Sequence, residues 1–469
     1  MCPSHYFSYN SMRTRRVTRL QQQNALMAST RTLPVEILCH IFSYTFGGET
    51  YGSQREFVRL GHICSEWRDA ILSTPKLWSQ FTLYISKSFD EILDLQLLLL
   101  YVNNSGNSPF RLDVHFRPFL KLLPVKTLNK IHEYVPKVHT LSIDGVCQWP
   151  MQDFPQFPMS WLSSVESLKL SSGVLCEPIK PRVLLNDFTH LRKLELKYFG
   201  IPRDVQLPWE QITSLKLDFW PIDLCMSLLV QCPNLVEFHA LHSRWPKTLH
   251  IPQLSGHAHK LKHLSWGFDS RPICNLLSHQ LRFPSLCTFH WHSPPQCTGL
   301  AEDEMGALRS LVSNFPPSIS QLHLFHTEGW SDEFMEFVFV ELKGLKSIHL
   351  SECTFSMVVQ LLSLLNKMND WAGSCILPVL AEIVIESVFL GYRFNEDSAR
   401  MEDKIASHMV PLFHFRDPHK RRQFSLHIVQ YDKTVSKGMC EAYFSLKKDG
   451  YAFKIWYRQN CCLEVPLPE

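Results

Sequence analysis

The 469-residue sequence lacks the short motifs that mark common catalytic and nucleotide-binding sites. It contains no G-x-S-x-G, no G-x-G-x-x-G, no Walker-type loop, no H-E-x-x-H and no Cys/His zinc spacing. Glycine is scarce, with 18 residues, which disfavours loops that cradle phosphate groups. The acidic run 302–304 lies at the start of a predicted helix, where carboxylates complement the helix dipole. We therefore expect no enzymatic activity, no cofactor and no metal.

Long apolar runs and a strong net charge are also missing. The longest run, ILDLQLLLLYV, is interrupted by Asp94 and Gln96 and is too short to span a bilayer. A net charge of +3 argues against nucleic acid or a membrane surface as the main partner. The 15 cysteines form no C-x-x-C pair and follow no signal peptide, which is typical of reduced thiols. The sequence predicts a soluble protein of the cytoplasm or nucleus.

The first acidic residue is Glu36, and the first thirty residues hold four arginines, at positions 13, 15, 16 and 19, among serine, glutamine and asparagine. A transit peptide has such a composition. The segment lacks apolar residues at amphipathic spacing, so we favour a disordered basic extension over residues 1–30.

The segment from Leu33 to Trp78 carries more apolar surface than its length can bury. Pro34 is suited to the first position of a helix, and residues 37, 38, 41 and 42 are apolar at helical spacing. A second helix is predicted over residues 55–72. Two short helices cannot bury this many aliphatic and aromatic side chains against each other, which implies a partner.

Three strings in this segment, L-P-x-E-I-L-x-x-I-F, L-x-x-I-C-x-x-W-R-x-x-I and T-P-x-L-W, resemble an F-box. The resemblance implies that the segment docks on the adaptor of a Skp–cullin–F-box ubiquitin ligase. Its adaptor-contacting residues would be Leu33, Pro34, Ile37, Leu38, Ile41, Phe42, Leu60, Ile63, Cys64, Trp67 and Arg68. The insert GGETYGSQREF between the two halves should extend a loop. The alternative is a helical hairpin that belongs to a larger core.

One pattern, L-x-x-L-x-L with apolar substitutes, returns from Val138 onward. Its ten instances begin at residues 138, 165, 191, 212, 235, 261, 286, 319, 345 and 380. A motif of this kind every roughly 25 residues resembles a leucine-rich repeat, in which each unit supplies one strand and a return segment. The Asn that regular repeats place after the motif is missing, so the units are degenerate.

Several return segments have helical periodicity. The expected helices cover residues 89–102, 119–134, 224–231, 302–312, 332–342 and 357–368. Further strands are expected at 110–116, 424–429 and 451–456, with a helix at 434–447 and another helix within 391–422. The predicted fold class is α/β: a helical F-box, then an irregular repeat solenoid with a parallel sheet, outer helices and a C-terminal cap.

The alternating positions of each motif should point to the open face of the sheet, where such arrays commonly bind partners. The central position gives a candidate target-binding set of Lys169, Glu195, Lys216, His239, His290, His323 and His349. Metal binding by these histidines is disfavoured because Cys and carboxylate ligands are nearly absent from the same columns. Either they form a recognition surface that titrates between pH 5 and 8, or they are solvated surface. The inward Trp266 and Trp291 should be core, with a ligand pocket beneath them as the alternative.

Together these features resemble fungal F-box proteins with degenerate repeats. The expected domains are an extension (1–30), an F-box (31–80), a solenoid (81–390) and a cap (391–469). The resemblance implies a non-catalytic substrate receptor that binds a Skp-type adaptor, through it a cullin, and an unknown target protein. The alternatives are an adaptor-binding scaffold without a role in ubiquitination and a repeat protein that senses a small molecule.

Overall fold

A computed structural model describes part of the chain. The described residues are 33–46, 53–85, 91–116, 138–145, 163–171, 188–197, 207–243, 256–268, 281–293, 302–327, 330–372, 377–386, 398–414, 425–430, 437–449, 452–457 and 461–462. The chain forms two compact units, the first comprising residues 1–191 and 204–206 and the second residues 192–203 and 207–469. The predicted helix at 119–134 and the predicted extension at 1–30 lie outside the described residues. Our boundaries for the four domains stay predictions.

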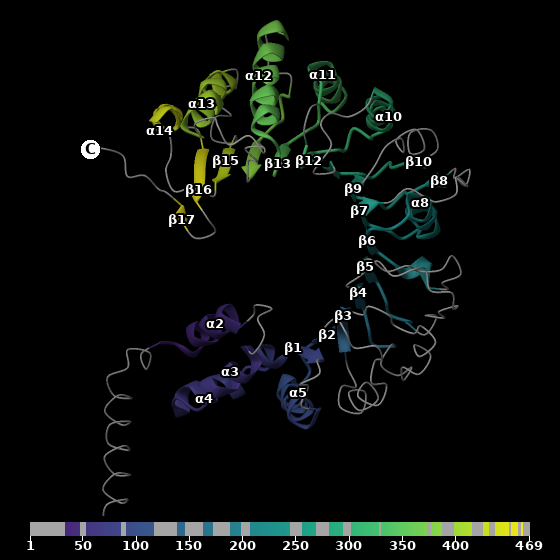
Figure 1. Ribbon diagram of the computed structural model, residues 1–469, viewed down its shortest axis with the longest axis vertical. Coiled ribbons are helices and arrows are strands. Elements are labelled where there is room, and N and C mark those ends of the chain that lie inside the picture. The colour runs from purple at the N-terminus through teal and green to yellow at the C-terminus, as the bar shows by residue number, and fades with distance from the viewer. Residues whose placement is uncertain are drawn as a thin grey trace, which may run out of the picture. The chain divides into compact units, whose positions relative to one another are not determined.

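The first unit begins with short helices (Figure 1). These are α2 (Val35–Phe46), α3 (Ser53–Leu60), α4 (Ser65–Leu72) and a 3-10 helix (Pro75–Trp78). The unit continues with β1 (Gln80–Ile85), α5 (Glu91–Ser105), β2 (Phe110–Phe116), β3 (Val138–Asp144) and β4 (Ser167–Ser171). Strands β1 to β4 pair in parallel and in chain order.

Three sequence-based expectations for the helices are wrong. The predicted helix over 55–72 is two helices, because a turn at residues 61–63 ends α3 and Cys64 is extended, with φ −153°. The carbonyl of Gly61 accepts a bond from Arg68 Nε at 2.8 Å, which holds this turn. The second half of the insert is helical, as part of α3, and not a loop. Pro34 precedes the helix, since its carbonyl accepts the first helical bond, from Leu38 N at 3.2 Å.

The second unit repeats one strand per motif. Its strands are β5 (Lys193–Lys197), β6 (Ser214–Asp218), β7 (Glu237–Ser243), β9 (His263–Phe268), β11 (Thr288–His292), β12 (Gln321–Phe325), β13 (Ser347–Ser351), β14 (Glu382–Glu386), β15 (Ser425–Gln430) and β16 (Ala452–Tyr457). They pair in parallel and in this order, and β17 (Cys461–Cys462) adds an antiparallel edge. A separate pair of short strands, β8 (Gly256–His257) and β10 (Leu281–Arg282), was not predicted.

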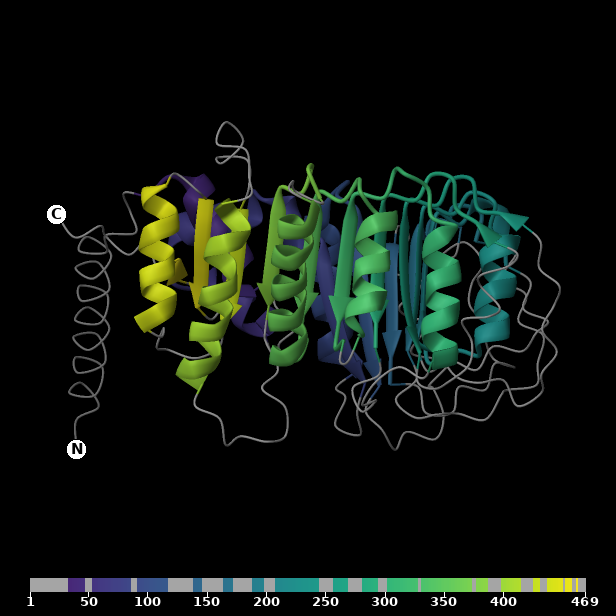
Figure 2. The ribbon, with the colours of Figure 1, turned by 90° about the horizontal axis from the view of Figure 1, so that it is seen from above.

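The helices of the second unit cover one face of its sheet, and the other face is open (Figures 1 and 2). They are α8 (Ile222–Gln231), α10 (Glu302–Ser313), α11 (Asp332–Glu341), α12 (Phe355–Ala372), α13 (Ser398–His414) and α14 (Lys437–Lys448), with a 3-10 turn at Trp209–Gln211. Within the described residues, each helix expected after residue 80 is found, with ends shifted by a few residues. The architecture is the predicted one, a parallel sheet with outer helices built from irregular repeats.

The core lies between the sheet and these helices. The motif leucines and their substitutes are buried, for example Leu194, Leu196, Leu322 and Leu324, each at most 2% exposed. Alternation along each strand sends one set of side chains to this core and the other to the open face. Trp266 and Trp291 are 0% and 2% exposed, which agrees with a core role.

Candidate functional site

Helix α2 carries two apolar stripes, and only one of them packs against the rest of the first unit. Leu38 and Phe42 are buried, at 5% and 2% exposure, and the Phe42 ring contacts the edge of Trp67 at 5.1 Å between centroids. The other stripe, Ile37, Ile41 and Tyr44, is 46%, 44% and 82% exposed. The spacing i, i+4, i+7 places these three side chains on one face of the helix.

Exposed apolar side chains concentrate in this helical segment. We define the outer stripe of α2, formed by Ile37, Ile41 and Tyr44, as the apolar face. Val35 is 45% and Ile63 60% exposed. Large exposed apolar side chains gathered in one short segment typically mark a protein interaction surface.

The predicted adaptor-contacting residues therefore separate by burial. Pro34, Ile37, Ile41, Ile63 and Arg68 are exposed, and Leu33, Leu60, Cys64 and Trp67 are half-buried. The expectation that Leu38 and Phe42 face another protein is wrong, because these side chains form the core of the helical segment. Sequence reasoning missed Val35 and Tyr44, although the spacing from Ile37 through Ile41 leads directly to Tyr44.

A cluster of aromatic rings joins this segment to the first strands. Phe57, Trp78, Phe81 and Tyr101 are each 2% exposed, and Tyr101 contacts the other three rings at 5.0 to 6.1 Å. Trp78 Nε1 donates to the carbonyl of Ile71 at 2.7 Å, which ties the 3-10 helix to α4. Trp78 and Phe81 therefore join the helical segment to β1 and α5.

The open face of the second unit's sheet brings together six of the seven predicted target-binding residues. Register pairs Glu195 with Lys216, Lys216 with His239, His290 with His323, and His323 with His349. The seventh residue, Lys169, is half-buried on β4 of the first unit. All seven are half-buried, since neighbouring strands stand close on both sides.

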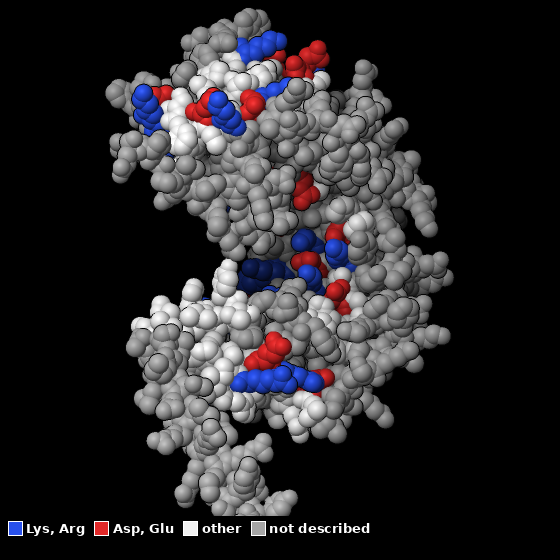
Figure 3. Space-filling model, turned by 60° about the vertical axis from the view of Figure 1, so that its left-hand side comes forward, with Lys and Arg blue, Asp and Glu red and all other residues white. Residues whose placement is uncertain are grey.

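Charged groups on the open face are paired between adjacent strands. Lys216 Nζ lies 3.6 Å from Glu195 Oε1, and Lys197 Nζ lies 3.4 Å from Asp218 Oδ2. His349 Nε2 lies 3.2 Å from Glu386 Oε2. In the view of Figure 3, Lys and Arg side chains lie beside Asp and Glu over the described surface, and neither sign forms a large patch of its own.

The central histidines contact one another as rings. The rings of His290 and His323 stack at 4.1 Å between centroids, and His349 lies 4.9 Å from His323. Burial lowers the pKa of His290 to about 3 and that of His323 to about 4, with further lowering from neighbouring histidines. The hypothesis that these two residues titrate between pH 5 and 8 is therefore wrong, because desolvation disfavours the charged imidazolium.

Metal-binding geometry is not found in the described part of the chain, where no three His, Cys, Asp or Glu side chains lie in a suitable arrangement. Among the same residues, no helix has the length and apolar character needed to cross a membrane. The cysteines whose side chains the structure describes, such as Cys39 and Cys232, form no disulfide bond.

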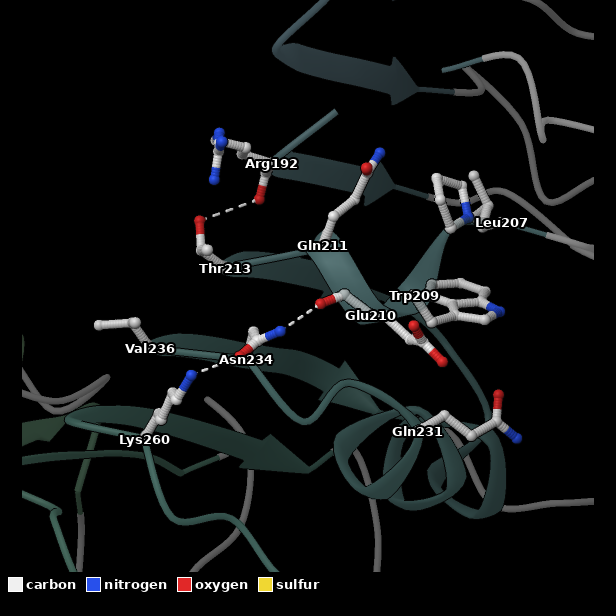
Figure 4. Close-up of a pocket in the computed structure, with 11 residues that line it drawn as sticks. Arg192, Leu207, Trp209, Glu210, Gln211, Thr213, Gln231, Asn234, Val236 and Lys260 are labelled. Atoms are coloured by element: carbon white, nitrogen blue, oxygen red, sulfur yellow. Dashed lines mark hydrogen bonds between the residues drawn. The ribbon is translucent and has the colours of Figure 1, made fainter. Parts of the chain in front are cut away.

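A pocket opens at the edge of the sheet where strands β6, β7 and β9 begin (Figure 4). Polar groups in its wall bond to each other: Asn234 Nδ2 donates to the carbonyl of Glu210 at 2.6 Å, and Lys260 Nζ donates to Asn234 Oδ1 at 2.5 Å. Neither Trp266 nor Trp291 lines it. The pocket therefore differs from the one that the small-molecule alternative placed beneath those two residues.

Comparison with known proteins locates one family in the chain. The model of the F-box-like family matches residues 30–84, which include α2, α3, α4 and nearly all of β1. A search of curated proteins finds no significant match.

Two solved structures share limited similarity with the chain. The leucine-rich repeat-containing protein LegL7 from Legionella pneumophila is 13% identical, with a TM-score of 0.37, over 72% of this chain and 98% of that one. A chain of the Rad7 and Elc1 complex in yeast is 14% identical, with a TM-score of 0.35, over 83% of this chain and 94% of that one. Because these scores are low, the fold assignment rests on the strands, helices and motif described above. The chain thus carries an F-box-like domain at residues 30–84, followed by irregular leucine-rich repeats with a parallel sheet and outer helices.

Proposed function

We propose that the protein is the non-catalytic target-recognition subunit of a Skp–cullin–F-box ubiquitin ligase. The observation that carries the proposal is the apolar face on the F-box-like domain, which lies beside the stripe of the domain's own core residues Leu38 and Phe42 and is left exposed. Burying such a face against a Skp-type adaptor removes apolar side chains from water, which is the main driving force of stable association.

The repeats would hold a target protein while the adaptor connects the chain to a cullin. The contribution of this chain to ubiquitin transfer is proximity, which raises the effective concentration of a target lysine near the charged ubiquitin. Bond formation is left to other subunits of the ligase. The paired charges and stacked rings of the open face suit binding better than catalysis.

The test is a pull-down of a purified Skp-type adaptor by the full-length protein carrying Ile37→Asp and Ile41→Asp. Both side chains are exposed, so folding should be unaffected. Affinity for the adaptor should fall at least about 100-fold, because each buried isoleucine contributes about 1.5–3 kcal/mol. Cullin, added to the mixture, should be recovered with the wild type and lost with the variant.

Leu93→Asp is the matched control, since Leu93 is 53% exposed on α5 outside the apolar face. This variant should bind the adaptor as the wild type does. Unchanged adaptor binding by the Ile37/Ile41 variant would refute the assignment of the docking face. Adaptor binding without cullin recovery would instead favour a scaffold.

A further inference from the structure

Four neighbouring strands of the second unit contain no Asp, Glu, Lys or Arg. These strands are β9, β11, β12 and β13, which pair in this order. Strands on both sides differ: β5 and β6 carry Lys and carboxylates, and β14 carries Glu382 and Glu386. We call the open face of the four strands the neutral strip; its central residues are Ser265, His290, His292, His323, Phe325 and His349.

Three histidines of the neutral strip, His290, His292 and His323, are uncharged rings at neutral pH. Desolvation by burial lowers the pKa of His292 to about 3, as it does for His290. Other histidines are the main charged neighbours acting on them, and they lower the pKa further. Two carboxylates at the strip's edge are paired with histidines, Glu386 with His349 and Glu352 with His326. A neutral imidazole keeps one donor and one acceptor nitrogen, so the strip bonds to uncharged polar groups.

Rings on adjacent strands of the strip contact one another. His292 stacks on Phe325 at 4.2 Å with 2° between the ring planes, beside the stack of His290 and His323. Gly267 faces His292 on the adjacent strand, and a Cβ at this position would lie 2.8 Å from His292 Cβ. A side chain there would push the ring out of its stack on Phe325, so this position favours glycine.

This arrangement matches the centre of a protein interface. Interface centres are depleted of charged residues and enriched in aromatic ones, while polar and charged groups occupy the rim. The neutral strip supplies the centre, and the Lys216–Glu195 and Lys197–Asp218 pairs on one side supply the rim. An acidic or a basic segment placed on the strip would lose its hydration and find no opposite charge.

We propose that the neutral strip is the centre of the target-binding surface and that it takes an uncharged, aromatic-rich segment of a protein target. The proposal rests on the proposed function for the presence of a target. It names the chemistry of that target, which the likeness to an F-box protein does not.

The test is selection of peptides from a random phage-displayed library on the full-length protein. Peptides should be enriched in Trp, Tyr and Phe and have a net charge near zero. Their affinity should change less than about twofold between about 50 and about 500 mM NaCl, because contacts without charge are not screened by salt. Combined His290→Glu and His323→Glu substitutions should weaken binding at least about tenfold, since they place unpaired carboxylates at the centre of the contact.

Lys193→Gln, an exposed position on β5, is the control and should leave binding unchanged. The double variant with His290→Gln and His323→Gln keeps polar, uncharged side chains. If the Glu and Gln variants are equally stable to heat and only the Glu variant loses peptide binding, the loss is an effect of charge. Enrichment of acidic or basic peptides, or peptides that bind wild type and the Glu variant equally, would overturn the proposal. Pull-down of the adaptor by the Glu variant tests the proposed function separately from the neutral strip. The proposed function predicts that this variant still binds the adaptor, whatever the peptide selection shows.

Discussion

At the scale of single residues, Phe42 and Tyr44 lie two positions apart on α2 with opposite surroundings. Phe42 is 2% exposed against Trp67, and Tyr44 is 82% exposed. Phe42→Ala should destabilise the first unit by about 3–5 kcal/mol, since it removes a buried ring and leaves a cavity. Tyr44→Ala should change stability by less than about 0.5 kcal/mol. Chemical denaturation of the two variants checks this, and similar losses in both would contradict the burial pattern.

Histidines of the neutral strip should make the second unit sensitive to acid. In the folded chain the pKa values of His290, His292 and His323 are about 3, 3 and 4. The unfolded chain takes up these protons at higher pH, near the ordinary value of about 6.5. Stability is therefore complete above about pH 6.5 and is lost as the pH falls towards about 4.

Thermal melts across this pH range measure the effect. The double variant with His290→Gln and His323→Gln should show a flatter dependence than the wild type, because fewer protons bind on unfolding. Parallel pH profiles for the two proteins would show that these histidines do not couple to folding.

Residue patterns predicted which stripes of α2 are apolar but not which one is buried. Residues 37 and 41 and residues 38 and 42 satisfy helical spacing equally well. The choice depends on where α4 and Trp67 pack, which is a tertiary property. The pKa values of the histidines on the open face could not be predicted from the sequence for the same reason, since they depend on how closely the neighbouring strands pack.

At the scale of elements, the strands of the second unit end in a recurring bend. Phe219, His242, His326 and Glu352 each follow or close a strand with positive φ, between 48° and 63°. The amide of Glu352 donates to the carbonyl of Glu386 at 2.9 Å, so the bend also links adjacent repeats. The left-handed region is unfavourable for residues with a Cβ.

Glycine should therefore be favoured over alanine at these bends. Glu352→Gly should be more stable than Glu352→Ala by about 1 kcal/mol, and both variants lose the same pair with His326. Ser347 on β13 is the control, where glycine should be less stable than alanine by about 0.5–1 kcal/mol. Urea denaturation measures the stability of the four variants. If glycine and alanine rank the same way at both positions, backbone strain is not the cause.

Strands could be predicted from the sequence wherever the repeated motif occurs. Each L-x-x-L-x-L within the described residues forms a strand, because alternation and a buried face leave little choice of register. Strand β1 was not predicted, and β8 and β10 are too short to show a period. The break between α3 and α4 was missed because apolar residues continue across Gly61 at helical spacing.

At the scale of the whole molecule, the helical segment and the first strands form one compact unit. The rings of Phe57, Trp78, Phe81 and Tyr101 pack together, and Arg55 of α3 bonds to Asp94 of α5 at 2.6 Å. Trp78→Ala should raise the hydrogen-exchange rates of α3, β1 and α5 together, since they share this core. Exchange in β11 to β13 should be unchanged, and faster exchange confined to α3 would show that the segment opens by itself.

The aromatic cluster also determines how orientation passes through the chain. A flexible linker would let the first repeats rotate freely once an adaptor is bound. Closely packed rings instead fix the orientation of the first repeats relative to the helical segment. In the proposed ligase, the aim of the first repeats relative to the adaptor would then be set by four side chains that touch neither ubiquitin nor target. Substitutions that loosen the packing of these rings would leave the affinities for adaptor and target intact and slow only the transfer of ubiquitin.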